Sequence, residues 1–232
     1  MRRLVAGLLC AGAALGHAAP KVEDSMAQRV QACTGCHGPQ GRAASDGYYP
    51  RIAGKPAGYL YNQLVGFRDG RRRYALMAGL LAPLSDAYLH EIAEHFAALD
   101  LPYPAPQPAT GKVDALARAE TLVRRGDAAL KLPACVQCHG AALMGAAPAV
   151  PALLGMPRDY LNAQLGAWRT GSRHAPSPDC MAQVAQRLAP ADIGALSQWL
   201  AAQPVPVGAK PAPGLPEPMP LRCGGLPAES AR

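Results

Sequence analysis

Two short stretches of the chain carry the same five-residue pattern, C-x-x-C-H, at residues 33–37 and 135–139. Two cysteines at this spacing, followed directly by histidine, form the attachment signature of a covalent c-type haem. The two thiols can bond to the two vinyl groups of one porphyrin, and the adjacent imidazole then binds the iron. The pattern therefore predicts two covalently bound haem c groups, attached through Cys33, Cys36, Cys135 and Cys138, with His37 and His139 as axial iron ligands.

Two other kinds of chemistry use paired cysteines. A zinc site would bring the four cysteines of both motifs together, but the spacing and the two histidines are not those of a usual zinc site. A thiol–disulfide oxidoreductase would activate Cys33 or Cys135 as a thiolate, yet its fold needs strands, and strand-like alternation is scarce in this sequence. We therefore expect haem attachment, with zinc binding and thiol exchange as the alternatives.

Haem iron in an electron-transfer protein needs a ligand on its other face, and two methionines are placed to supply it. Met77 follows His37 by 40 residues, and Met181 follows His139 by 42 residues. Ligation by histidine and methionine is used by electron-transfer cytochromes. We expect Met77 and Met181 to be the second axial ligands, with His174 as the alternative in the second copy.

A ligating imidazole normally donates its other N–H group to a carbonyl or carboxylate oxygen. Pro50 and Pro151 each begin a Pro-x-x-x-Gly segment that occurs twice in the chain. We expect the backbone carbonyl groups of these two prolines to accept the hydrogen bonds from the two histidines. The alternative is that the prolines only shape a turn.

The similarity between the two halves of the chain extends beyond these motifs. Residues of the first half that return about 101 positions later include Tyr59, Gln63 and Leu64, which correspond to Tyr160, Gln164 and Leu165. Solenoid repeats have periods of about 20–50 residues, so two copies at this period indicate duplicated domains.

Within each copy the apolar residues follow helical spacing. Ser85 is expected to cap a helix that continues to residue 96, and Pro190 is expected to open the corresponding helix of the second copy. Further helices are predicted over residues 23–32, 59–67 and 160–168. The sequence thus predicts an all-α fold of two tandem domains, each wrapped around one haem.

Composition excludes several classes of protein. The chain has 232 residues, of which 50% are apolar and 17% charged, so a disordered chain is excluded. The net charge is +7, of which Arg2 and Arg3 of the expected signal peptide supply two, so the mature chain is too weakly basic to make nucleic acid the default partner. No apolar run reaches the roughly 18 residues of a membrane-spanning helix. Aromatic residues are only 5% of the chain, and two macrocycles would fill the space that aromatic rings usually occupy.

The beginning of the chain has the order of a secretory signal peptide. Arg2 and Arg3 precede an apolar run from Leu4 to Leu15, and small residues follow. We expect cleavage near Ala18 and export to the periplasm.

The chain resembles the dihaem cytochromes c of the cytochrome c4 type over about residues 25–203. The resemblance rests on both C-x-x-C-H motifs, the segments that begin at Pro50 and Pro151, residues 59–64 and 160–165, and Met77 and Met181. It implies two class I cytochrome c domains in one periplasmic chain, each haem held by histidine and methionine. It also implies transfer of electrons toward terminal oxidases or other redox enzymes.

These observations divide the chain into five parts. They are the signal peptide (1–18), a first cytochrome c domain (19–100), a Pro-rich linker (101–112), a second cytochrome c domain (113–203) and a Pro-rich extended tail (204–232). The tail departs from what the resemblance implies, and so do two cysteines outside the motifs, Cys180 and Cys223. Because these two thiols remain after haem attachment in an oxidising compartment, we expect them to form a disulfide.

The predicted function is that of a periplasmic carrier of electrons between respiratory-chain or dehydrogenase donors and a terminal oxidase or another redox acceptor. The alternatives are a haem-containing electron-transfer subunit of a periplasmic dehydrogenase and a dihaem peroxidase. Redox proteins are the expected partners. The densest charge cluster of the chain could steer them, and it consists of Arg68, Arg71, Arg72 and Arg73. The alternatives for this cluster are a solvated loop and neutralisation of the haem propionates.

Overall fold

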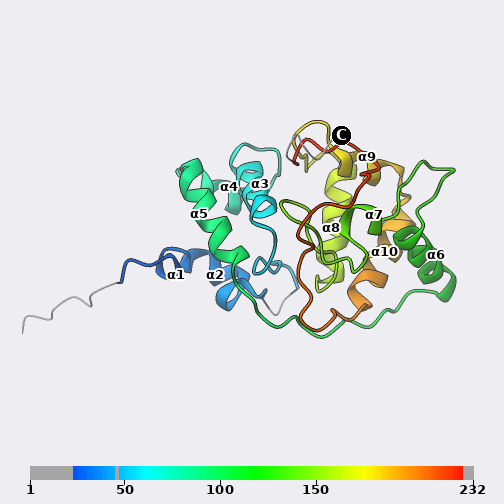
Figure 1. The fold of residues 1–232 in the computed structure, drawn as a ribbon, viewed down its shortest axis with the longest axis horizontal. Coiled ribbons are helices and arrows are strands. Elements are labelled where there is room, and N and C mark those ends of the chain that lie inside the picture. Colours follow the sequence, from blue (N-terminus) through cyan, green and yellow to red (C-terminus); the bar gives the residue numbers. More distant parts are fainter. Residues whose placement is uncertain (1–22, 45–46, 227–232) are drawn as a thin grey trace, which may run out of the picture.

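The computed structural model of the chain describes residues 23–44 and 47–226, and within these ranges it is helical (Figure 1). The β-structure in this part of the chain is limited to isolated bridges between extended segments. The proposed signal peptide lies outside the described residues. No helix in the described ranges is long and apolar enough to cross a membrane.

The first half contains six helical segments. Their bounds are α1 Met26–Arg29, α2 Gln31–His37, the short 3-10 helix η1 Pro39–Gly41, α3 Ala57–Arg68, α4 Ala75–Leu81 and α5 Asp86–Ala97. Helix α3 packs against α4 and α5. Ser85 caps α5 as expected, because its hydroxyl group accepts a hydrogen bond from the Tyr88 N–H at 3.3 Å.

The helix predicted over residues 23–32 is wrong in its bounds. The chain turns at Val30, which separates α1 from α2, and the first cysteine pair lies on α2 itself. Val30 is only 2% exposed and belongs to the core of the first half. Packing of this side chain against the core outweighs the local preference for one continuous helix.

The second half repeats this arrangement with five helices. Their bounds are α6 Val113–Arg124, α7 Val136–His139, α8 Arg158–Arg169, α9 Cys180–Arg187 and α10 Pro190–Ala202. Helix α8 packs against α9 and α10, as α3 packs against α4 and α5, and α10 also packs against α6. Helix α10 begins at Pro190, whose fixed φ suits the first helical position.

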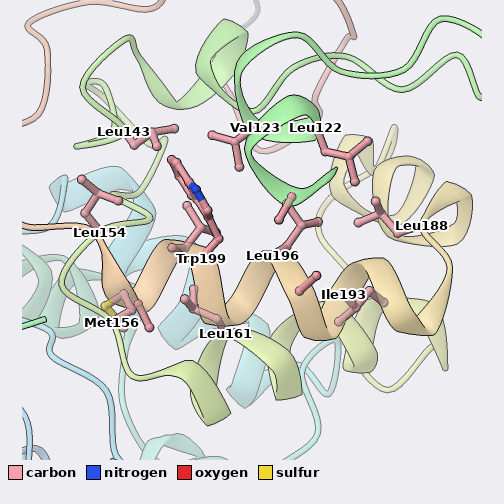
Figure 2. Close-up of a cluster of buried hydrophobic side chains, with 14 of the residues drawn as sticks. Leu122, Val123, Leu143, Leu154, Met156, Leu161, Leu188, Ile193, Leu196 and Trp199 are labelled. Carbon is pink, nitrogen blue, oxygen red and sulfur yellow. The ribbon is translucent and has the colours of Figure 1, made fainter. Parts of the chain in front are cut away.

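Each half has its own hydrophobic core. In the second half, Ile193, Leu196 and Trp199 of α10 lie against residues of α6 and α8, among them Leu122 and Leu161 (Figure 2). Full burial of one such side chain contributes roughly 1.5–3 kcal/mol. In the first half, the corresponding cluster is built around α3 and α5. Two separate cores agree with a duplicated domain.

The two halves meet where the chain leaves α3 and α8. Arg72 and Arg173 form an antiparallel bridge. Two backbone hydrogen bonds flank this bridge. The Arg73 N–H donates to the Ser172 carbonyl at 3.0 Å, and the His174 N–H donates to the Arg71 carbonyl at 2.6 Å. The halves therefore join backbone to backbone at equivalent loops.

The Pro-rich linker is extended and is held against both halves. The Arg51 guanidinium group donates to the carbonyl groups of Leu101 at 2.6 Å and Pro102 at 2.8 Å. Farther along, the Gln107 N–H donates to the Ala201 carbonyl at the end of α10. These hydrogen bonds hold the linker in a fixed position against both halves, so it does not act as a flexible hinge.

After α10 the tail returns across the second half without forming a helix in the described residues. Ala212 pairs with the segment at residues 145–147 through two backbone hydrogen bonds. Farther along, Cys180 and Cys223 form a disulfide, with Cα atoms 5.1 Å apart. The tail is thereby joined to the first residue of α9, next to Met181.

Candidate functional site

The first C-x-x-C-H motif lies on α2 and lines a large apolar cavity in the first half. Cys33, Cys36 and His37 project from this helix, and Met77 lines the same cavity from α4. Apolar side chains of α3 and α5, among them Leu60, Phe67 and Ile92, form part of the remaining wall, and polar residues of both halves form another part. The predicted haem ligands and attachment points of the first half thus come together in one cavity.

The second motif repeats this arrangement. Cys135 precedes α7, Cys138 and His139 lie on it, and all three line a cavity of the second half together with Met181 on α9. His174 lines the same cavity, so both residues considered as a second ligand are near it. The position of Met181 on α9 matches that of Met77 on α4.

Both histidines are oriented by a proline carbonyl. The Nδ1–H group of His37 donates to the Pro50 carbonyl at 2.8 Å, and that of His139 donates to the Pro151 carbonyl at 2.8 Å. The two side chains are 8% and 7% exposed. Burial lowers the pKa of both imidazoles, which favours their neutral form. With Nδ1–H engaged, Nε2 carries the lone pair that can bind a metal.

The motif cysteines are unsuited to thiol exchange. All four are free thiols. Burial raises the pKa of Cys33 and Cys138 and raises that of Cys135 to about 12. An exchange-active cysteine needs a lowered pKa, whereas burial raises the pKa of these three cysteines. Among residues 23–44 and 47–226 no group of three or more His, Cys, Asp or Glu side chains could hold a metal ion, and the two cysteine pairs line different cavities.

Between the two cavities lies a polar cluster with approximate two-fold symmetry. Its members line both cavities, and we call them the shared wall: Lys55, Tyr59, Gln63, Arg72, Tyr160, Gln164 and Arg173. Arg72 donates to Gln164 Oε1 at 2.6 Å and to the Tyr160 hydroxyl at 3.0 Å. Arg173 makes the mirrored bonds, to Gln63 Oε1 at 2.7 Å and to the Tyr59 hydroxyl at 3.5 Å. Side chains of each half therefore close the cavity of the other.

The shared wall carries positive charge without a protein counter-charge. None of Lys55, Arg72 and Arg173 makes an ion pair with a carboxylate within the described residues. Arg173 is only 3% exposed, and burial lowers its pKa. Buried charges are normally paired, so these cations call for an anion in the cavities.

A haem fits both cavities by these criteria. The apolar walls suit the macrocycle, the thiol pair suits its vinyl groups, and its two carboxylates would supply the anions that the shared wall lacks. In the second cavity, the indole N–H of Trp168 is also buried without a hydrogen-bond partner in the protein. A carboxylate oxygen is an acceptor for such a donor.

The two cavities differ in how they are covered. Five residues of the tail line the second cavity, namely Met219, Leu221, Cys223, Gly225 and Leu226. No described residue of the tail lines the first cavity. There, Cys36 is exposed, and so are three large apolar side chains of the lining: Tyr48, Leu76 and Leu80. The first cavity thus has an open apolar edge, whereas the tail covers the second.

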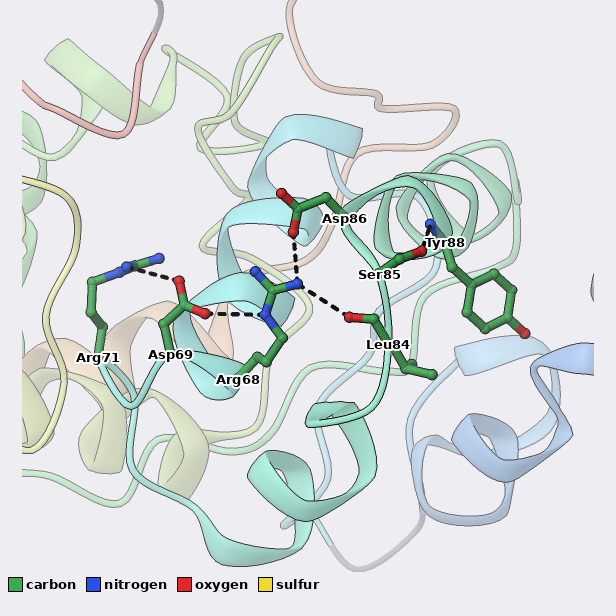
Figure 3. Close-up of polar contacts among 7 residues, drawn as sticks. All are labelled: Arg68, Asp69, Arg71, Leu84, Ser85, Asp86 and Tyr88. Carbon is green, nitrogen blue, oxygen red and sulfur yellow. Dashed lines mark hydrogen bonds and ion pairs between the residues drawn. The ribbon is translucent and has the colours of Figure 1, made fainter.

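The structure does not support the expected docking role of the arginine cluster. Arg68 forms ion pairs with Asp69 at 3.1 Å and Asp86 at 2.6 Å, and Arg71 pairs with Asp69 at 3.2 Å (Figure 3). Arg72 points into the shared wall. Of the four arginines in this cluster, Arg73 is the one that is exposed and forms no ion pair with another described residue. The sequence shows four adjacent charges, but it does not show that three of them are bound within the chain.

Sequence reasoning missed the shared wall. Tyr59, Gln63, Tyr160 and Gln164 were noted only as matching positions of the repeat. Arg72 was considered only as a member of the arginine cluster, and Lys55 and Arg173 were not singled out. A signal was present, because polar residues that recur at equivalent positions of two domains are candidates for a symmetric contact between them.

Comparison with known proteins identifies relatives of the whole chain. A family model described as cytochrome c matches residues 123–203. The chain is 40% identical to the "Thiosulfate dehydrogenase electron acceptor" of Thiomonas intermedia (strain K12), with 88% of this chain and 93% of that protein covered.

Two solved structures are also similar. Reduced cytochrome c4 from Pseudomonas stutzeri matches with a TM-score of 0.66 and 30% identity over 76% of this chain and 95% of that one. The thiosulfate dehydrogenase TsdBA from Marichromatium purpuratum matches with a TM-score of 0.67 and 34% identity over 75% of this chain. This chain spans only 36% of the length of the latter protein.

Proposed function

The chain belongs to the dihaem cytochrome c4 family, and we propose that it accepts single electrons in the periplasm from a dehydrogenase that oxidises thiosulfate or a related sulfur compound, and passes them to a respiratory acceptor. As a member of this family it is an electron-transfer cytochrome with two covalently bound haem c groups, rather than a catalytic enzyme. The 40% identity to the Thiomonas electron acceptor over nearly all of both chains supports the proposed donor.

The proposed haem-binding residues are those that line the two cavities. Cys33 and Cys36 attach the first haem, and His37 and Met77 ligate its iron. In the second half, the same roles fall in order to Cys135, Cys138, His139 and Met181. The bound iron supplies the chemistry, which is a reversible change between ferric and ferrous states.

The protein around each haem is arranged to change little during this reaction. The Pro50 and Pro151 carbonyl groups hold the imidazole rings by hydrogen bonds of 2.8 Å, so their orientation is fixed before the iron changes charge. A thioether sulfur as the second ligand raises the reduction potential and leaves no open position on the iron for substrate. The apolar walls keep water from the site. These features suit electron transfer and oppose the peroxidase alternative.

The proposed donor can be tested with purified proteins. The oxidised cytochrome is mixed with a thiosulfate-oxidising dehydrogenase and thiosulfate, and the haem absorption bands are followed in time. Both haems should become reduced, and omission of thiosulfate should leave them oxidised. Dithionite added at the end gives the fully reduced reference spectrum. A sample that dithionite reduces but the dehydrogenase does not would contradict the proposed donor.

An alternative is that the chain works as a stable subunit of such a dehydrogenase. The match to 36% of the longer TsdBA chain favours this alternative, because a similar domain pair then lies within a single thiosulfate dehydrogenase protein. Purification of the native protein from its own cells distinguishes the two. A carrier elutes alone, whereas a subunit elutes with the dehydrogenase at constant ratio.

We further propose that the donor reaches the first haem. The edge of the first cavity presents Cys36, Leu76 and Leu80 to solvent, whereas the tail occupies the matching region of the second. Replacing Leu80 by Glu should slow reduction by the donor at least tenfold, because a charge would be desolvated on contact. Val207→Glu, at a fully exposed tail position, is the matched control. Equal rates for the two variants would exclude this site of contact.

A further inference from the structure

Lys55 is a buried lysine between the two haem cavities. It lies just before α3, is 7% exposed and lines both cavities. Its ammonium group donates a hydrogen bond to the Met156 sulfur of the other half at 3.4 Å. The same group lies 5.9 Å from the centroid of the Tyr59 ring, within the range of a cation–π contact. Both halves of the chain therefore fix the position of this single charge.

Lys55 breaks the symmetry of the shared wall. The other members occur as pairs 101 residues apart, namely Tyr59 with Tyr160, Gln63 with Gln164, and Arg72 with Arg173. The residue 101 positions after Lys55 is Met156, the residue whose sulfur it contacts. A neutral side chain thus occupies the equivalent turn of the second half, which shows that this backbone does not require a lysine.

The charge of Lys55 is not compensated by the protein. No carboxylate within the described residues pairs with it. Three cations face it, Arg51, Arg72 and Arg173, and the nearby polar groups are the hydroxyls of Tyr59 and Tyr160. Burial, with help from these arginines, lowers the pKa of Lys55 to about 8. An uncompensated buried charge is destabilising. The fold thus holds this charge at a fixed place although the charge does not stabilise the fold, which points to a role other than folding.

We propose that Lys55 is a positioning residue whose single positive charge, held at the junction of the two haem cavities, raises the reduction potentials of both haems together. Reduction adds an electron to each haem, and a nearby cation favours the reduced form. The two arginines of the shared wall also carry positive charges that line both cavities. Each of them, however, donates a hydrogen bond to a glutamine of the other half. Lys55 is the cation of this wall that has no counterpart in the repeat.

The size of the effect follows from Coulomb's law. Two unit charges about 10 Å apart, at an effective dielectric constant of about 20, change an equilibrium constant by roughly tenfold. A tenfold change in a one-electron reduction equilibrium corresponds to 59 mV. Because Lys55 lines both cavities, the change should occur at both haems and with the same sign.

The test is a redox titration of the complete, haem-loaded protein, followed by optical absorption. Lys55→Met introduces the side chain found at the equivalent turn and should lower both potentials, each by about 59 mV. Lys55→Arg keeps the charge and should leave both potentials near those of the wild type. Lys112→Met removes an exposed charge from the linker and is the control for net charge.

The sulfur-to-iron absorption band serves as a check on each variant, because it reports intact methionine ligation in both halves. A Lys55→Met protein with the full band and unchanged potentials would overturn the proposal. So would a shift confined to one haem, or an equal shift in Lys55→Arg, since either result would indicate a local packing effect. The titration needs no protein partner, so its result is independent of the donor proposed above.

Discussion

The disulfide between Cys180 and Cys223 should contribute a large part of the stability of the second half. It closes a segment with a sequence separation of 43 residues. In the chain-entropy model, a loop of this length restricts the unfolded chain by about 4 kcal/mol. Few other contacts hold this part of the tail. The Gly224 N–H donates to the Pro178 carbonyl, and the Asn62 side chain donates to the Gly225 carbonyl, each worth about 1 kcal/mol. Replacing Cys223 by Ser should therefore free the tail and destabilise the half that it covers.

The assay is equilibrium unfolding in guanidinium chloride, followed at the haem absorption bands and by far-UV circular dichroism. For a denaturant dependence of about 4 kcal/mol per M, a loss of about 4 kcal/mol moves the midpoint down by about 1 M. Hydrogen exchange gives a second, local readout. The amide groups of Gly224 and Leu226, which are hydrogen-bonded within and beside the tail, should exchange faster once the disulfide is absent.

Two controls isolate the effect of the crosslink. The double variant Cys180→Ser with Cys223→Ser should match Cys223→Ser alone, which excludes an effect of the free thiol beside Met181. Val207→Ser changes a fully exposed side chain of the same tail and should leave the midpoint unchanged. A midpoint for Cys223→Ser within about 0.2 M of the wild type, with slow exchange at Gly224, would refute the reasoning.

Three further predictions concern single side chains. Met181→Ala should remove about half of the sulfur-to-iron absorption band and lower one reduction potential, and Met77→Ala should do the same. A full band in the Met181→Ala protein would mean that Met181 is not a ligand. Gly126→Ala should destabilise the second half by more than about 2 kcal/mol in denaturant, because φ there is +72° and the added Cβ would clash with the Leu132 carbonyl oxygen. Asn62→Ala should cost about 1 kcal/mol, measured as faster amide exchange in the tail and not as a changed redox spectrum.

Much of the haem chemistry could be predicted because it is encoded in contiguous motifs. A C-x-x-C-H segment contains both attachment points and one proposed ligand within five residues, so no knowledge of the fold is needed to identify it. The repeat then located the equivalent methionines and prolines. Helices α3, α5, α8 and α10 were predicted near their observed positions, because their apolar residues follow a helical period and Ser85 and Pro190 mark two of the starts.

The local sequence pattern predicted helix bounds and the partners of charged residues less well where tertiary packing competes with local preference. The helix predicted over residues 23–32 is interrupted at Val30, whose side chain enters the core. The cluster of four arginines gives no sign in the sequence that Asp86, many residues away, pairs with Arg68, or that Arg72 turns inward. Charge density along a chain does not report which charges are free.

The sequence by itself determined that this protein holds two haems in two helical domains, because covalent attachment depends on residues that are neighbours in the chain. The tertiary structure decided how those domains face each other, that Lys55 and Met156 meet between the cavities, and that the described part of the tail covers the second cavity and not the first. These contacts join residues that are distant in sequence. They depend on the loops after α3 and α8 meeting between the halves, where Arg72 and Arg173 each bond to a glutamine of the other half.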